Sequence, residues 1–397
     1  MKFGVFFETG RVTLLVFSAL LYGCQRPAAS IAAKTATAGA QVTSLPAQRQ
    51  VDDAARFLAG LPGKSGSDFL ELESDPAWKE HKRQMDAAWA NAEAQLLEGL
   101  RQFQKNELSA APLAEGPVWY PFSGPDALIM TTCFPRSRVY IMMALEPAGT
   151  LPTAEQMRKK PLGPYLAAIR ETVASELGRS FFITREMDRQ FRGQVTDGLL
   201  VPILQLLVRT GHTILGFRYV RVDEHGRVVE RPGGVPVGAP FANKGLDLEF
   251  RTDADQSIHR LYYFTVNLSN PRLSKNQGVL EYISHIQGAT SMLKATSYMT
   301  HKPEFSMIRD LVLAHSAAVM EDDSGVPFHC FAANTWKLQL YGDYYQPYGS
   351  FKWLEQADLR KAYQAGGAKP LSMHMGYGFR KITSNLLLAR RRDAAPQ

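Results

Sequence analysis

Five polar side chains could meet a ligand, and each is expected beside a turn that joins a strand to a helix or loop. A hydroxyl, carboxylates, an amide and an imidazole can hydrogen-bond a polar ligand, but they form no complete catalytic set. We therefore predict ligand binding and leave the catalytic residues unknown. The candidates are Ser123, Asp126, Glu146, Asn267 and His301.

Glu146 and His301 occupy similar places in the predicted chain. Glu146 closes an apolar strand, and an acid at the carboxyl end of a parallel strand faces the crevice where such sheets bind ligands. His301 lies between a buried strand and the helix that Pro303 opens, where free N–H groups attract an anion. A structural role for Glu146 and a plain loop position for His301 remain open.

Asp126 and Ser123 have simpler interpretations. Asp126 comes at a predicted helix start, where a carboxylate caps free N–H groups, and this structural role is favoured over a site. Ser123 is not part of a Gly-x-Ser-x-Gly sequence and has no histidine nearby in the sequence, which argues against a nucleophile.

Metal binding has little support in the sequence. Glu321-Asp-Asp323 has the hard oxygen ligands that Ca²⁺ and Mg²⁺ prefer, but the following Ser324-Gly325 favours a helix end and a turn. The zinc patterns His-x-x-His, His-Glu-x-x-His and Cys-x-x-Cys do not occur. We predict no metal.

Aromatic residues are dense between Trp336 and Trp353. Tyrosine combines an apolar ring with a polar tip and suits a surface that stacks on sugars or packs on a partner protein. Part of this stretch is a predicted strand, so core packing is the alternative.

The pattern of apolar residues predicts an amphipathic helix of about 30 residues that begins after Asp75-Pro76 and ends near Leu108, followed by alternating strands and helices. Strands are expected at 117–122, 138–146, 213–222, 259–268 and 291–299, with an inserted edge strand at 246–251 and a final hairpin of 326–332 and 336–341. Helices are expected at 125–134, 164–177, 185–192, 199–210, 277–287 and 303–320.

This order predicts an α/β fold with a mainly parallel, Rossmann-like sheet, helices on both faces, a C-terminal β-hairpin and a helical N-terminal segment. Parallel strands joined by right-handed crossovers all point the same way, so their strand-to-helix turns meet at one rim. The five candidate residues should therefore lie at the same end of the sheet.

The element order between about 115 and 345 resembles the Rossmann-type fold of S-adenosylmethionine-dependent methyltransferases. The matching residues are the turn Phe122-Ser-Gly-Pro-Asp126, Glu146 and Asn267-Leu-Ser-Asn270. The resemblance implies that cofactor or substrate would contact these places. A Rossmann-like transferase, or a hydrolase that uses His301 and an acid, is thus the alternative to a binding protein, and the cofactor stays unknown.

The N-terminus is typical of an exported protein. Lys2 and Arg11 precede an apolar run, 12–23, which is short for a bilayer that needs roughly 20 helical residues. Leu21-Tyr-Gly-Cys24 resembles the lipobox of bacterial lipoproteins, which implies acylation of Cys24. Gln25 follows, and the resemblance then implies the outer membrane, facing the periplasm. Ordinary secretion and an uncleaved anchor are the alternatives.

Composition sets the remaining limits. We expect a signal peptide at 1–23, a disordered tether at 24–50, a helical segment at 51–110 and the α/β domain at 111–397. The net charge is +7, and the charged residues are interspersed along the chain, which is compatible with binding to a lipid surface. The sequence contains no basic motif for nucleic-acid binding. A small molecule, a glycan or a protein remains the possible partner.

An arginine run, a histidine and two cysteines have structural interpretations. Arg390-Arg-Arg392 is expected in a solvated tail, and His212 at a helix C-terminus. Cys133 and Cys330 could form a disulfide in an oxidising compartment or stay as free thiols.

Overall fold

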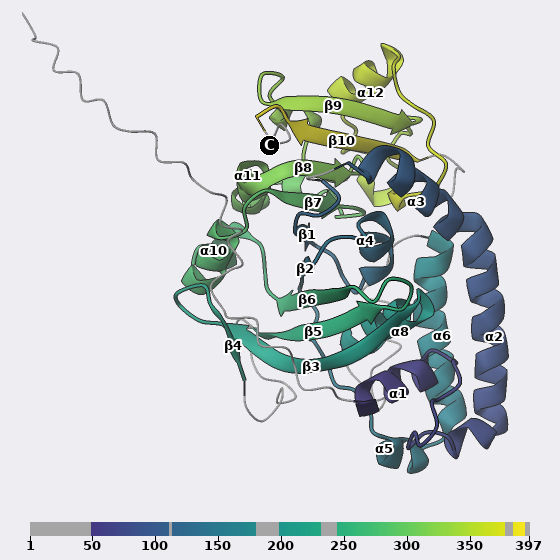
Figure 1. The fold of residues 1–397 in the computed structure, drawn as a ribbon. Coiled ribbons are helices and arrows are strands. Elements are labelled where there is room, and N and C mark those ends of the chain that lie inside the picture. Colours follow the sequence, from purple (N-terminus) through teal and green to yellow (C-terminus); the bar gives the residue numbers. More distant parts are fainter. Residues whose placement is uncertain (1–48, 111–112, 180–197, 232–243, 378–383, 394–397) are drawn as a thin grey trace, which may run out of the picture. The chain divides into compact units, whose positions relative to one another are not determined.

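A computed structural model describes residues 49–110, 113–179, 198–231, 244–377 and 384–393. The predicted signal peptide, the lipobox, nearly all of the tether and the helix expected at 185–192 lie outside these residues. The described chain is a mixed α/β structure built on a ten-stranded sheet in the order β4-β3-β5-β6-β2-β1-β7-β8-β10-β9 (Figure 1).

The strands confirm the α/β class and most of the expected strand positions. They are β1 (Val118–Pro121), β2 (Val139–Ala144), β3 (His212–Val222), β4 (Val228–Glu230), β5 (Lys244–Thr252), β6 (Ile258–Thr265), β7 (Ala289–Leu293), β8 (Ser316–Glu321), β9 (Trp336–Gly342) and β10 (Asn385–Arg391).

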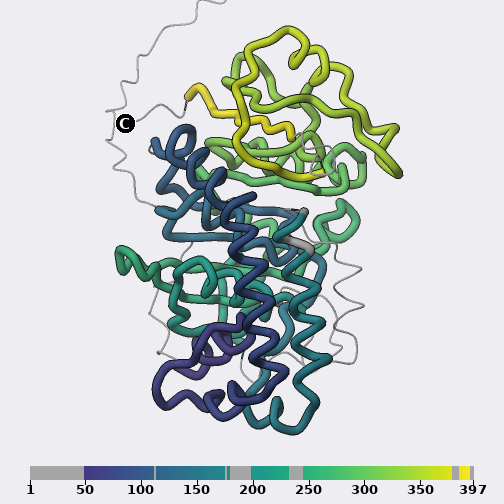
Figure 2. The backbone as a smooth tube through the Cα atoms, turned by 90° about the vertical axis from the view of Figure 1, so that its right-hand side faces the viewer, coloured from purple at the N-terminus to yellow at the C-terminus, as the bar shows by residue number. Residues whose placement is uncertain are grey.

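The N-terminal helices agree with the periodicity of the sequence. After α1 (Arg49–Leu58), α2 (Pro76–Ala92) begins at the N-cap Asp75, whose side chain accepts a hydrogen bond from the Ala77 N–H. The helical stretch continues through two π-turns and α3 (Glu98–Phe103) to Leu108, as predicted. Figure 2 shows α2 beside α6 (Leu162–Arg179).

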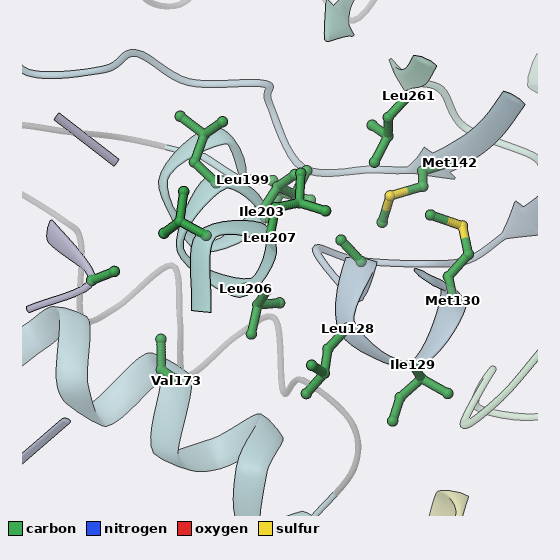
Figure 3. Packing of buried hydrophobic residues seen from close by; sticks show 14 of the residues in the cluster. Leu128, Ile129, Met130, Met142, Val173, Leu199, Ile203, Leu206, Leu207 and Leu261 are labelled. Carbon is green, nitrogen blue, oxygen red and sulfur yellow. The ribbon is translucent and has the colours of Figure 1, made fainter. Parts of the chain in front are cut away.

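The other helices cover both faces of the sheet. They are α4 (Ala127–Cys133), α5 (Ala154–Arg158), α8 (Leu200–Arg209), α9 (Asn270–Leu273), α10 (Gln277–Ser284), α11 (Ser306–His315) and α12 (Ala357–Gln364). Side chains alternate along a strand, so Tyr120 packs with α4 and α8 while Trp119 packs with α10 and α11. Figure 3 shows the first of these layers, in which Ile203 and Leu207 lie near Leu128 and Met142.

The mainly parallel sheet is not confirmed. Among the described strands, five pairings are antiparallel and four are parallel. The parallel pairings are contiguous and form the centre, β6-β2-β1-β7-β8. The segment expected as an edge strand, β5, lies between β3 and β6 instead, because β3 and β4 extend the sheet beyond it.

The C-terminal part of the prediction was wrong in three places. The helix expected at 303–320 ends at His315, and its last residues form β8. The strand expected at 326–332 contains a 3₁₀ turn, so the predicted hairpin does not form. β9 pairs instead with β10, a strand that the sequence did not predict and whose last two residues, Arg390 and Arg391, were expected in a solvated tail.

Arg390 and Arg391 are therefore structural residues. The Arg390 guanidinium donates to the carbonyl of Glu107, and Arg391 donates to the carbonyls of Leu313 and Ser316. These contacts join the last strand to the N-terminal helices and to α11.

Two open questions on local features are answered. Cys133 is buried, Cys330 is half-buried, and both are free thiols. His212 begins β3, and its Nδ1 lies 3.0 Å from the Leu207 carbonyl at the end of α8, as expected. Within the described ranges, no helix has the combination of length and apolar character that crossing a bilayer requires.

Candidate functional site

The carboxyl ends of the parallel strands place four of the five candidate residues on successive connections. Ser123 follows β1, Glu146 follows β2, Asn267 follows β6, and His301 follows β7. Backbone hydrogen bonds join these ends: the Ser123 N–H donates to the Met143 carbonyl, and the Val266 N–H to the Ala144 carbonyl. Glu146 and His301 thus lie at the same edge of the sheet.

Asp126, the fifth candidate, belongs to the interior. It is the N-cap of α4 and accepts from the Ile129 N–H at 3.1 Å. Its other oxygen lies 2.6 Å from Lys294 Nζ, and the Tyr120 hydroxyl donates to it at 3.1 Å. The ion pair is buried, so Asp126 stabilises the junction of β1 and β7, in agreement with the structural interpretation.

The hydroxyl of Ser123 is hydrogen-bonded within its own turn. The hydroxyl is buried and donates to the Gly124 carbonyl at 2.9 Å. Phe122 and Gly124 have φ angles of +62° and +54°, so the turn after β1 is tightly wound. These contacts give Ser123 no activating base and agree with its exclusion as a nucleophile.

Glu146 and Asn267 remain as candidates for ligand contact. The Glu146 carbonyl accepts from the hydroxyls of Tyr263 at 2.5 Å and Thr265 at 2.9 Å, which fixes the backbone while the side chain stays half-buried. Asn267 Oδ1 accepts a hydrogen bond from the Ser269 N–H. This bond closes a turn that orders the start of α9. Leu145, beside the acid, is 48% exposed.

His301 is a neutral, largely buried histidine. Burial lowers its pKa to about 4, and a hydrogen bond with the Gly325 backbone only partly opposes this shift. Its ring meets Tyr298 edge-on at 5.1 Å between centroids, and Nε2 is buried without a hydrogen-bond partner in the structure as described. A neutral imidazole adds no positive charge to the free N–H groups that were expected to attract an anion at this place.

The acidic turn Glu321-Asp-Asp323 lies at the end of the last parallel strand, β8, and not at a helix end as expected. It follows β8 and is buried. Asp323 accepts from the hydroxyls of Tyr298 at 2.5 Å and Tyr345 at 2.9 Å, and from Asn385 Nδ2 at 3.2 Å. One carboxylate thus connects the loop after β7, the segment after β9 and the start of β10.

Burial changes the titration of these acids. It raises the pKa of Glu321 well above its usual range and raises that of Asp322. The pKa of Asp323 rises to about 7, from burial first and from repulsion by Asp322 second. Among the described side chains, no three histidines, cysteines or acids could hold a metal ion together.

The loop after β7 has an unusual backbone. Ala295, Ser297 and Tyr298 have φ angles of +51°, +56° and +53°, a region that residues other than glycine rarely adopt. The Ala295 N–H donates to Asp322 Oδ2 at 3.0 Å, and the Ser297 N–H donates to the Tyr377 hydroxyl at 3.1 Å. These bonds hold the loop in a strained form, which is most often found at functional edges.

The aromatic stretch after Gly342 is used mainly for packing. The Tyr348 hydroxyl donates to the Tyr377 carbonyl, and Phe351 lies against the rings of Tyr298 and Tyr377. Trp353 is different because it is 81% exposed, with Lys352 Nζ 4.4 Å from the centroid of its ring.

The Asp323 carboxyl should add a negative slope to the dependence of stability on pH between about 4 and 7, against the positive slope from His81 and His301, whose pKa values burial lowers to about 4. The pKa of Asp323 is higher in the folded chain than in the unfolded chain, so the folded state binds more protons between the two values. Asp323→Asn should reduce this slope, measured as the urea midpoint of unfolding at several pH values. Asp310→Asn, which changes an exposed acid of α11, should leave the slope unchanged.

Comparison with known proteins identifies no relative: no family model, no curated protein and no solved structure matches this chain.

Proposed function

We propose that this chain is an exported lipoprotein of the bacterial outer membrane, whose α/β domain binds a small polar ligand at the carboxyl edge of its sheet. The observation that carries the proposal is the place of Glu146. The acid lies half-buried at the end of β2, about 20 residues after Gly124 in the turn after β1. In Rossmann folds an acid so placed hydrogen-bonds the hydroxyls of a ribose.

The turn after β1 narrows the class of ligand. Dinucleotide-binding folds use free N–H groups at the start of the first helix to hold a pyrophosphate. Here Pro125 has no N–H, and the Asp126 carboxylate already accepts from Ile129. The N–H groups at the start of α4 are therefore not free for a phosphate, and a nucleoside without phosphate fits the edge better than a nucleotide.

A transferase that uses S-adenosylmethionine is the second candidate function. The order β6-β2-β1-β7-β8-β10-β9, in which only β10 is reversed, supports it, because the sheet of those methyltransferases has the same arrangement. A sulfonium ligand would also be compatible with the half-buried carboxylate of Glu146. Neither Ser123 nor His301 is placed as an activated base, so binding is the preferred function.

Thermal unfolding with ligands tests both candidates. We expect adenosine or S-adenosylhomocysteine to raise the unfolding midpoint of the Cys24→Ser chain, because a ligand at 100 times its Kd stabilises the native state by about 2.7 kcal/mol. Glu146→Gln should abolish most of this rise, whereas Glu155→Gln, on the exposed face of α5, should not.

Three results would count against this assignment. A rise with ADP-ribose but not with adenosine would contradict the argument from Asp126. A rise that Glu146→Gln leaves intact would place the ligand elsewhere. Methyl transfer from S-adenosylmethionine to an envelope fraction, lost in Glu146→Gln, would favour the transferase.

The lipid anchor has its own test. Cys24→Ser should release the protein from the membrane fraction or leave an unprocessed precursor, because the lipobox cysteine carries the acyl chains. Metabolic labelling with a palmitate analogue measures the modification directly. Unchanged labelling of Cys24→Ser would refute the lipoprotein proposal and leave the ligand site untouched.

A further inference from the structure

A serine and a histidine meet at the turn between β5 and β6, at the opposite end of β6 from Asn267. Ser257 precedes the first residue of β6, and His259 follows two residues later. Ser257 Oγ lies 2.7 Å from His259 Nε2, and Thr252 Oγ1 lies 2.9 Å from the same nitrogen. β6 has eight residues, which puts this place roughly 25 Å from the proposed ligand edge.

The third contact of the ring fixes its tautomer. His259 Nδ1 lies 2.7 Å from the carbonyl oxygen of Ser137. A carbonyl only accepts, so in the neutral ring Nδ1 carries the proton and Nε2 carries the lone pair. Of the two hydroxyls beside Nε2, that of Ser257 is the nearer, and when it donates to this lone pair the two side chains have the arrangement of a nucleophile and its general base.

Packing holds the imidazole in place. His259 is 1% exposed and is stacked on Phe250 at 5.2 Å between centroids. Burial lowers the pKa of His259, with Arg138 acting in the same direction, while the Ser137 carbonyl and Asp255 oppose the shift. The ring is thus neutral near pH 7, as a base requires.

The serine is held as firmly as the base, yet it is only half-buried. Gln256, directly before it, has a φ of +60°, a left-handed conformation that is unusual for a residue with a side chain. The Ser257 N–H donates to Asp255 Oδ1 at 2.9 Å. A left-handed residue commonly closes a short hairpin loop such as this one, so the feature that distinguishes the turn is the contact between Ser257 and His259.

We propose that Ser257 and His259 form a nucleophile–base pair that hydrolyses carboxylic esters, a second site independent of the proposed ligand edge. Ser257 Oγ attacks the ester carbon and forms a C–O bond while its proton passes to His259 Nε2. The bond from that carbon to the alcohol oxygen breaks, and the alcohol takes the proton from His259. Water, deprotonated by the same nitrogen, then releases the acid and restores the serine.

The neighbours of Ser257 indicate the kind of ester. Ile258 is 50% exposed and offers an apolar contact for an acyl group. The exposed Arg138 donates to the Ile258 carbonyl at 3.2 Å, which places a cation beside the residue that follows Ser257. A short, uncharged acyl ester matches these two groups.

A fluorophosphonate probe on the Cys24→Ser chain tests the pair, because attack by an activated serine forms an O–P bond and expels fluoride. Mass spectrometry should locate the adduct on Ser257. Ser257→Ala should lose the adduct and at least 100-fold of the p-nitrophenyl acetate hydrolysis above background. Ser74→Ala, which removes an exposed serine hydroxyl in the turn before α2, should keep both.

The pH profile separates a base from a structural hydrogen bond. The groups that face the His259 ring are Arg138, Asp255 and His212, whose ring centroid is 6.4 Å away. Labelling should stay constant from pH 8 to 6.5 and fall only below that. An unlabelled wild type, an adduct on another residue, equal labelling of Ser257→Ala, or loss of labelling in Ser74→Ala would each overturn the proposal.

Discussion

Replacing Lys294 by methionine should lower the free energy of unfolding by about 3–5 kcal/mol, because it leaves a buried carboxylate without its cation. The side chains of Lys294 and Asp126 are 1% and 2% exposed, and Nζ lies 2.6 Å from Oδ2. Water cannot replace the lost charge at this depth. Urea unfolding at pH 7, followed by circular dichroism, measures the change.

Lys159 provides the matched control. Its Nζ also lies 2.6 Å from a carboxylate, that of Glu155, but the two side chains are 70% and 75% exposed. Lys159→Met should change stability by less than about 1 kcal/mol. The double variant Lys294→Met/Asp126→Asn removes both buried charges and should recover part of the loss. Equal effects of Lys294→Met and Lys159→Met would contradict the interior role of the pair.

Gly376→Ala should lower the free energy of unfolding by about 2–4 kcal/mol, a sum of backbone strain and steric overlap. Gly376 has a φ of +65°, and a Cβ built on it would overlap the Asp322 carboxylate, whose Cγ would be 2.8 Å away. That carboxylate is bonded to the Ala295 and Ser324 N–H groups, so it has little freedom to move.

Gly366→Ala separates the two contributions. Gly366 has a φ of +83°, but a Cβ there meets no atom within 4 Å. It should therefore show only the conformational cost, about 1 kcal/mol. Thermal unfolding of both variants gives the difference. If Gly376→Ala is no worse than Gly366→Ala, the segment around Gly376 does not pack on the acidic turn as described.

The sequence by itself determined the elements whose signal is local. The N-cap Asp75, the proline after it and the apolar spacing to Phe103 identify the long helix, because capping and helical periodicity act within a few residues. The apolar runs of β1 and β2, and the turns after them, were located for the same reason. So was the capping role of Asp126.

Only the tertiary structure decided which segments pair. Apolar residues recur along the whole stretch from 306 to 321, and periodicity cannot tell a helix followed by a strand from one longer helix. β10 ends in two arginines, with a third directly after it, and looks like a tail, yet pairing with β8 and β9 buries its leucines. Those pairings join residues that are at least 43 positions apart in the sequence, so a local sequence pattern does not predict them.

The residues of the candidate site likewise fall into those that the sequence located and those that only the fold identified. Glu146 and Asn267 could be located because both follow strands with clear local signals. Lys294 and Asp323 could not, because the chemistry of each depends on distant partners: Asp126 for the lysine, and Tyr345 and Asn385 for the acid. A buried charge is stable only beside its partners, and the fold, rather than the residue type, brings those partners together.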